Sequence, residues 1–270
     1  MIIDDWVGLE RIEFEAQIDF YRAAPDALRV SHAIGVRRVG AATCLTCRTF
    51  EPTSIFRRVV GFGMGQATSE AEIDDALSFM NAQRQQYAVS VSPHAAPSEL
   101  STWLETRGFT RGYAWMKFHR QCDAVPSVET DLHIRIVGRE FRDVFGSVVS
   151  EAFGLPNAIA PWLAALPGRS GWICAMAFAG EHPVAAGAAY VSGEYAWLGF
   201  GATKVAHRSR GAQRALLARR LDEAAARGVR VAVTETGEGV PGKPSNSYRN
   251  ILRAGFAEAY LRANFMSAAR

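Results

Sequence analysis

The feature that most constrains the fold is an α/β pattern that occurs twice along the chain. In residues 56–80 a β-branched run is followed by Gly-Phe-Gly and then by a helical pattern, and the same order recurs in residues 193–221. Each copy continues with a strand, a short helix that closes at a glycine (Gly108 or Gly255), and a strand-like tail. A glycine directly after a helical pattern is typical of the left-handed residue that ends a helix. We therefore predict two copies of one α/β unit.

The join between the copies is predicted in residues 121–131, a polar stretch that contains a proline and has no apolar periodicity. This places one domain at residues 1–122 and a second at residues 131–270. In the second, three consecutive apolar strands are expected, with tight turns near Gly180 and Gly193. The predicted fold class is α/β (α+β), and each unit is expected to be a mixed, mostly antiparallel sheet flanked by helices.

Composition excludes several classes of protein. The 270 residues are 49% hydrophobic and contain no long unbroken apolar run, so no transmembrane helix is expected. The first residues lack the basic and apolar regions of a signal peptide, and four cysteines do not suggest a disulfide framework, so a cytoplasmic protein is expected. Cys44 and Cys47 have a metal-site spacing but no second ligand pair, and we predict no metal site.

The net charge of +3 is unevenly distributed along the chain. Residues 201–270 hold 13 Lys and Arg against 5 Asp and Glu, and the cations gather in "TKVAHRSRGAQRALLARR", residues 203–220. This stretch opens a predicted helix, whose first N–H groups and dipole favour an anion. Gly211 lets the anion approach the main chain, and flanking arginines add charge-assisted hydrogen bonds. We predict an anion-binding site here.

The same helix has an apolar stripe. Leu217, Leu221 and Ala224 are expected to be buried, which would leave Arg219, Arg220 and Arg227 mostly outside.

The run from Arg208 to Gln213 resembles the phosphate loop of the GNAT acetyltransferase superfamily, which reads Arg/Gln-x-x-Gly-x-Gly/Ala; Gln213 is the one departure. The resemblance covers residues 132–266. Residues 1–120 look like a degenerate second GNAT unit, because the equivalent loop "GQATSEAEIDD" has no arginine and carries several carboxylates that would repel a pyrophosphate. The resemblance implies a tandem arrangement that binds one acetyl-CoA.

The resemblance also implies direct transfer of an acetyl group from acetyl-CoA to an amine of a small molecule or peptide. Main-chain groups at Ala202, Thr203 and Val205 are the implied contacts of the pantetheine arm and thioester, and Asn246 is a further one. Either Asn246 or Ser247 is expected to cap the last helix. The implied contacts of the pyrophosphate are Arg208, Arg210, Gly211, Ala212, Gln213 and Arg214.

Transfer to an amine needs a base, and the departing thiolate is helped by an acid. Glu235 is the first candidate for the base. It ends a strand on the face of Val231 and Val233, where burial would raise its pKa; a solvated strand-end carboxylate is the alternative. Glu238, on the loop that follows, is the second candidate. The family's tyrosine on the last helix is replaced by Ile251. Tyr248, one turn earlier, is either a substitute acid or a packing residue.

Two other functions remain open at this point. The chain could bind acyl-CoA without turnover, as a sensor or pseudoenzyme, which the missing tyrosine favours. It could also bind nucleic acid through its basic part, although the arginines gather at one helix mouth instead of following a stripe with aromatics. We expect an amine acceptor, no nucleic acid, no membrane, and a monomer or homodimer. Residues 153–166 and the loop 237–246 are expected to select the acceptor.

Overall fold

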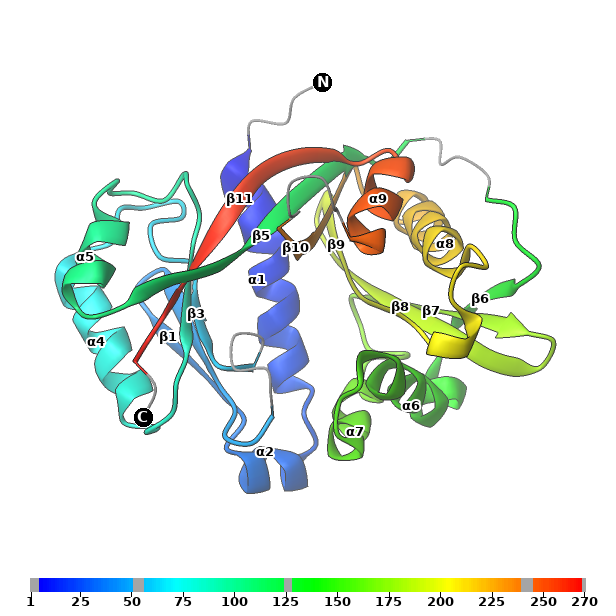
Figure 1. Cartoon of the computed structure of the whole chain (residues 1–270), viewed down its shortest axis with the longest axis horizontal. Coiled ribbons are helices and arrows are strands. Elements are labelled where there is room, and N and C mark those ends of the chain that lie inside the picture. The colour runs from blue at the N-terminus through cyan, green and yellow to red at the C-terminus, as the bar shows by residue number, and fades with distance from the viewer. Residues whose placement is uncertain (1–4, 51–55, 124–127, 239–244, 269–270) are drawn as a thin grey trace. The chain divides into compact units, whose positions relative to one another are not determined.

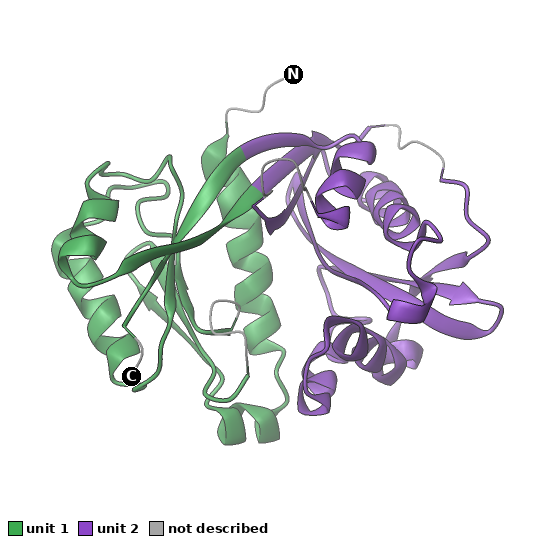
Figure 2. Cartoon of the chain, viewed as in Figure 1, with its two compact units in different colours: residues 1–116, 260–270 green, residues 117–259 purple. Residues whose placement is uncertain are grey.

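The computed structural model describes residues 5–50, 56–123, 128–238 and 245–268, and all statements below concern these ranges. The chain forms two compact units, which are coloured separately in Figure 2. Unit 1 consists of residues 1–116 together with residues 260–270, and unit 2 consists of residues 117–259. No helix in the described ranges is both long and apolar enough to cross a membrane.

Unit 1 joins a sheet to helices that pack on it (Figure 1). Its strands lie in the order β1-β2-β3-β4-β11-β5, in which β3 and β4 are parallel and the pairs β1–β2, β2–β3 and β4–β11 are antiparallel. Its elements in chain order are α1 (Trp6–Arg22), α2 (Asp26–His32), β1 (Gly35–Val39), β2 (Ala42–Thr46), β3 (Arg58–Val60), α4 (Glu70–Asn81), β4 (Ala88–Val91), α5 (Leu100–Thr106) and β5 (Thr110–Gln121), whose last residues enter unit 2.

In unit 2 the strands follow in the order β10-β9-β8-β7-β6, with β5 next to β10. Strands β9 and β10 are parallel, whereas the pairs β6–β7, β7–β8 and β8–β9 are antiparallel. Its elements are β6 (His133–Val137), η1 (Arg139–Phe141), α6 (Arg142–Phe153), η2 (Asn157–Ile159), α7 (Ala160–Leu163), β7 (Trp172–Ala179), β8 (His182–Ser192), β9 (Tyr195–Thr203), η3 (Val205–His207), α8 (Ala212–Ala226), β10 (Val231–Gly237), α9 (Asn246–Arg253) and the first residues of β11 (Ala257–Met266), which then enters unit 1. The predicted fold class is confirmed.

The last strand completes unit 1. Residues 263–266 of β11 pair antiparallel with β4, and Phe265 joins the core cluster that α4 and α5 form with the strands of unit 1. The compact units therefore differ from the domains 1–122 and 131–270 expected from the sequence, because strand pairing returns the end of the chain to unit 1. The division of the chain into two copies of one unit stays a prediction.

Helices cover both faces of the sheet in unit 2, with α8 on one face and α6 and α7 on the other (Figure 1). The apolar stripe of α8 is buried as predicted, at Leu217, Leu221 and Ala224. The expectation that Arg220 lies outside is wrong, because only 2% of this residue is exposed. Its guanidinium enters a space that Gly187 of β8 leaves open: a Cβ at Gly187 would lie 2.8 Å from Cζ of Arg220.

The two Gly-Phe-Gly segments have the predicted order but different conformations. In the first copy the segment follows β3, and both Gly61 and Gly63 have positive φ angles. In the second copy the segment lies inside β9, and its central residue, Phe200, has the positive φ of 55°. The same three letters therefore form a turn in one copy and a strand irregularity in the other.

Candidate functional site

In unit 2, strands β9 and β10 are paired at first and then separate. Their parallel pairing runs from Val231–Tyr195 to Thr234–Leu198, while β9 continues to Thr203 and β10 to Gly237. The edge of β9 that faces β10 is thus open from Gly199 onward in the described pairing. An open strand edge offers N–H and C=O groups to an extended ligand.

A β-bulge in β9 marks the point of separation. The register between β8 and β9 shifts between Ala186, which pairs with Ala202, and Ala188, which pairs with Gly199. Two residues of β9, Phe200 and Gly201, therefore oppose one residue of β8. A bulge of this kind bends the strand and frees it from regular pairing.

The chain then turns into α8 through two residues of left-handed conformation. Ser209 has φ 65° and Gly211 has φ 80°, and Gly211 is the N-cap of the helix. No side chain in the described ranges caps α8. The first N–H groups of any helix lack partners within the helix. Because no described side chain caps these groups in α8, they can bind an anion.

A groove with a volume of about 600 Å³ opens at this helix end. Four arginines line it (Arg208, Arg214, Arg249 and Arg253), and no Asp or Glu does so in the part of the chain described. The remaining lining residues are Ala152, Phe153, Gly201, Ala202, Thr203, Ser209, Gly211, Ala212, Gln213, Ser245, Asn246, Ser247 and Asn250. The groove joins a positively charged mouth to the open edge of β9.

Most of the residues that the sequence singled out for the ligand meet in this groove, and two do not. Arg210 instead forms an ion pair with Asp131, and hydrogen bonding to Asp131 raises the pKa of its guanidinium. Val205 lies in η3, with 72% of its surface exposed. Arg208 stays in the groove, where its Nε donates to the carbonyl oxygen of Thr203 over 3.3 Å.

Helix α9 supplies groove residues that sequence reasoning missed. Arg249 and Arg253 are four residues apart on this helix and both line the groove. Their spacing is a signal that could have been found, because residues at i and i+4 share a helix face. The N-cap of α9 is Ser245, whose Oγ accepts from the N–H of Tyr248 at 3.2 Å; the expectation of Asn246 or Ser247 is off by one or two residues.

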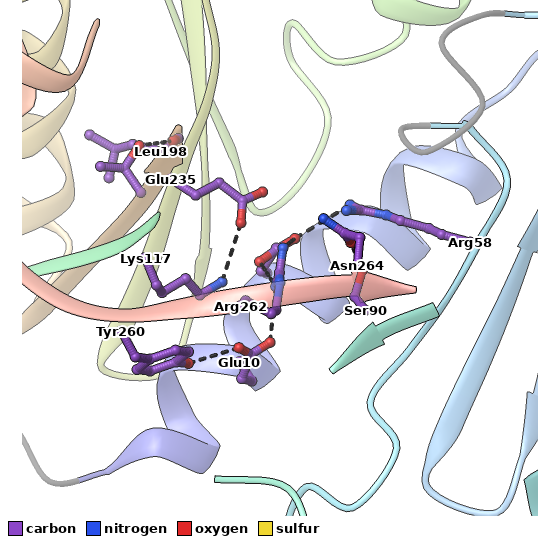
Figure 3. Close-up of polar contacts among 11 residues, drawn as sticks. Glu10, Arg58, Ser90, Lys117, Leu198, Glu235, Tyr260, Arg262 and Asn264 are labelled. Atoms are coloured by element: carbon purple, nitrogen blue, oxygen red, sulfur yellow. Dashed lines mark hydrogen bonds and ion pairs between the residues drawn. The ribbon is translucent and has the colours of Figure 1, made fainter. Parts of the chain in front are cut away.

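Glu235 is the first residue of β10 beyond the paired segment. Its side chain is 10% exposed, and Oε2 lies 3.7 Å from Nζ of Lys117, whose side chain is fully buried (Figure 3). The alternative of a solvated strand-end carboxylate is therefore wrong. Lys117 and Glu235 therefore form a largely buried ion pair inside unit 2.

Tyr248 lies in the first turn of α9, packed edge-on against Phe118. Its hydroxyl donates to Oε1 of Glu258 over 2.5 Å. Burial, together with this hydrogen bond, raises the pKa of the phenol to about 12. Tyr248 therefore packs against Phe118, and its hydroxyl proton is held in a hydrogen bond to Glu258.

The corresponding helix of unit 1 begins differently. Ser69 caps α4 in a capping box with Glu72: Oγ of Ser69 accepts from the N–H of Glu72, and Oε2 of Glu72 accepts from the N–H of Ser69. The N–H of Gly63 donates to Thr68 over 2.6 Å, and a Cβ at Gly63 would lie 2.5 Å from main-chain atoms of Ala96. The N–H groups of Gly63, Ser69 and Glu72 are therefore hydrogen-bonded to side chains of unit 1 itself.

Unit 1 also contains a buried charge cluster that the sequence did not predict. Arg262 of β11 donates to Glu10 over 3.0 Å and to Glu13 over 2.5 Å, both on α1 (Figure 3). Arg58 contacts Glu13 as well, and Tyr260 donates to Glu10 over 2.8 Å. Buried charges persist where they are paired in this way. The cluster ties α1 and β3 to the last strand.

No family model and no curated protein sequence matches the chain. Solved structures do match. A GCN5-related N-acetyltransferase from Kribbella flavida has a TM-score of 0.68 at 15% identity, over 98% of this chain and 96% of that chain. One from Sphaerobacter thermophilus has a TM-score of 0.61 at 16% identity, over 98% and 94%.

A tandem GNAT protein from the clavulanic acid biosynthesis pathway is also similar, with a TM-score of 0.62 at 16% identity, over 97% of this chain and 93% of that chain. Identities this low establish fold and leave activity to be argued from the site. Along nearly its whole length, the chain has the fold of the GCN5-related N-acetyltransferases.

Proposed function

We propose that this protein is an N-acetyltransferase that binds one acetyl-CoA in the groove of unit 2 and transfers the acetyl group directly to an amine. The observation that carries the proposal is the meeting, in one groove, of an uncapped helix start, four arginines and an open strand edge. Each of these three features fits a different part of acetyl-CoA.

The mouth of the groove fits the pyrophosphate. Gly211 in its left-handed conformation brings the first N–H groups of α8 to the surface, and Arg208, Arg214, Arg249 and Arg253 add positive charge. The open edge of β9 around Ala202 and Thr203 fits the pantetheine arm, whose amides pair well with strand groups. Asn246 and Gln213 line the path between them.

The reaction follows from the thioester. The amine nitrogen forms a bond to the carbonyl carbon, the carbon–sulfur bond breaks, the nitrogen loses a proton and the sulfur gains one. We assign Glu235 as the base, because this largely buried carboxylate lies where β9 and β10 separate. The acceptor would approach this separation.

Tyr248 is our proposed acid, with a specific requirement. Its hydroxyl proton is donated to Glu258, so protonation of the sulfur needs that hydrogen bond to break. The same observation supports a second candidate function, an acyl-CoA-binding protein without turnover. A phenol with a pKa of about 12 is a poor proton donor at neutral pH, and such a protein would need none.

One experiment separates the two functions. Acetyl-CoA is titrated into the protein by calorimetry, and then a library of amines is screened for acetyl-CoA consumption. Binding with turnover supports the N-acetyltransferase, and binding without turnover on any amine supports the acyl-CoA-binding protein. Absence of acetyl-CoA binding would contradict both.

A further inference from the structure

Arg220 is a buried cation with neutral partners. Only 2% of the residue is exposed, and no Asp or Glu in the described ranges forms an ion pair with it. Burial lowers the pKa of its guanidinium to about 10, so the group is still charged at neutral pH. A buried charge without a counterion is costly, which calls for a function other than stability.

Its hydrogen bonds converge on the bulge of β9. Nη1 donates to the carbonyl oxygens of Ala188, at 2.6 Å, and Gly199, at 3.0 Å, while Nε donates to Leu216 of its own helix at 2.9 Å. Ala188 and Gly199 are register partners on β8 and β9, at the edge of the register shift. One nitrogen therefore bridges both strands at the point where β9 leaves regular pairing.

Two neighbouring glycines shape the space around the guanidinium. A Cβ at Gly187 would lie 2.8 Å from Cζ, so only glycine leaves room for the group. A Cβ at Gly201 would lie 3.7 Å from Nη2, and Gly201 itself lines the groove. A guanidinium carries five N–H donors. Three are used by the carbonyl oxygens, and Nη2 has no acceptor among the described residues.

We propose that Arg220 is a positioning residue of the acyl-transfer site: it holds the bulged segment 199–201 in one conformation and places positive charge beneath the end of the groove. The inference rests on the proposed function. Negative charge develops on the thioester oxygen and on the departing sulfur during transfer, and fixed positive charge in a buried setting stabilises it. Arg220 acts through the strand and needs no contact with the pyrophosphate.

The chain offers a matched control in unit 1. Arg57 is also buried, with 5% exposed, and donates to the main-chain oxygens of Cys47, Phe50 and Gln86 over 3.0–3.1 Å. Replacing either arginine by lysine keeps the charge and removes the branched donor. Arg57→Lys thus shows the effect of changing a buried arginine in unit 1, and only Arg220→Lys should affect the acyl-transfer site.

The test compares Arg220→Lys, Gly187→Ala and Arg57→Lys. We expect kcat to fall about 10- to 100-fold in the first two, with acetyl-CoA affinity within about threefold of wild type and Arg57→Lys unchanged in both. Hydrogen exchange should become faster at residues 199–203 in Arg220→Lys and Gly187→Ala, and not in Arg57→Lys. This exchange readout does not depend on turnover.

The outcomes are distinguishable. If the wild-type protein fails to bind acetyl-CoA, the proposed function is contradicted. Faster hydrogen exchange in Arg220→Lys would still support the part of the inference in which Arg220 holds segment 199–201 in one conformation. Protein that turns over, with kcat of Arg220→Lys within about twofold of wild type, overturns the inference. An equal fall of kcat in Arg57→Lys overturns it too, since the effect would then be one of stability.

Discussion

Nδ2 of Asn250 donates a hydrogen bond of 2.8 Å to Oε1 of Gln213, and so joins α9 to the first turn of α8. Gln213 is the residue at which the loop departs from the glycine or alanine of the family's pattern. Its side chain turns towards α9, the helix that carries Arg249 and Arg253. The departure therefore links the two helices whose arginines line the groove.

We predict that Gln213→Ala and Asn250→Ala each weaken acetyl-CoA binding about three- to tenfold, as expected for loss of one neutral hydrogen bond. The double variant should be little worse than either single variant, because both remove the same link. Calorimetry on all four proteins gives the coupling. Fully additive losses would show that the hydrogen bond does not organise the groove.

Two neighbouring arginines should differ in their effect on binding. Arg214 lines the groove, whereas Arg210 is paired with Asp131 outside its lining. We expect Arg214→Ala to weaken acetyl-CoA binding by about 1.5–3 kcal/mol, the usual value for a charge-assisted contact, and Arg210→Ala to have a smaller effect. The difference should shrink at high salt, which screens both charges. A larger loss for Arg210→Ala would place the pyrophosphate on the other side of the loop.

Much of this fold could be predicted from the sequence. The α/β order, the three consecutive strands and the helix that opens at Gly211 follow from local periodicity and from glycine positions. The burial of Arg220 could not be predicted, because it depends on Gly187, a residue 33 positions earlier that only the sheet brings near. The return of β11 to unit 1 likewise depends on strand pairing at long range.

In the candidate site, too, some features follow from local sequence and others depend on contacts between distant residues. The anion-binding loop has a local signal, since N–H groups, glycine and arginines are all adjacent in sequence. The partners of Glu235 and Tyr248 have none. Lys117 lies 118 residues before Glu235, and Glu258 is on a different element from Tyr248. Side-chain partners of catalytic candidates had to come from the structure.

The phenol of Tyr248 should lose its proton at a higher pH than an ordinary tyrosine. Burial and the hydrogen bond to Glu258 raise its pKa to about 12, so the phenol stays neutral as pH passes the ordinary tyrosine value of ~10. The stabilisation that this shift represents is present below that pH and is lost as pH rises through about 12. The ultraviolet difference titration between wild type and Tyr248→Phe isolates this one phenol.

Glu258→Gln serves as the control for that titration. Removing the carboxylate removes one cause of the shift, so the midpoint of Tyr248 should move down towards the ordinary range. A Tyr248 midpoint that is already ordinary in the wild-type protein would contradict the hydrogen bond to Glu258.

Glu235→Gln should lower kcat about 10²- to 10⁴-fold on a true acceptor and leave acetyl-CoA affinity unchanged, because the amide cannot accept the amine proton. Tyr248→Phe should lower kcat as well if the phenol protonates the sulfur. The matched control is Glu194→Gln, which alters an exposed carboxylate paired with Arg230 ahead of β9. Wild-type turnover in Glu235→Gln would remove Glu235 as the base.

The central claim is one acetyl-CoA site per chain, at the start of α8. Gly211 and Gly228 flank this helix with similar φ angles of 80° and 82°, so Gly211→Glu and Gly228→Glu carry similar backbone strain. Only the first places a carboxylate at the proposed pyrophosphate site. In unit 1 the start of α4 differs, because the N–H groups of Ser69 and Glu72 bond to each other's side chains in a capping box.

Calorimetric titration of acetyl-CoA into the wild-type protein and these two variants tests the claim most directly. We predict a stoichiometry of about one per chain, binding lost in Gly211→Glu, and binding kept in Gly228→Glu, because an anion at the helix start gains from the free N–H groups and a carboxylate there displaces it. A stoichiometry near two, or undiminished binding by Gly211→Glu, would contradict the account.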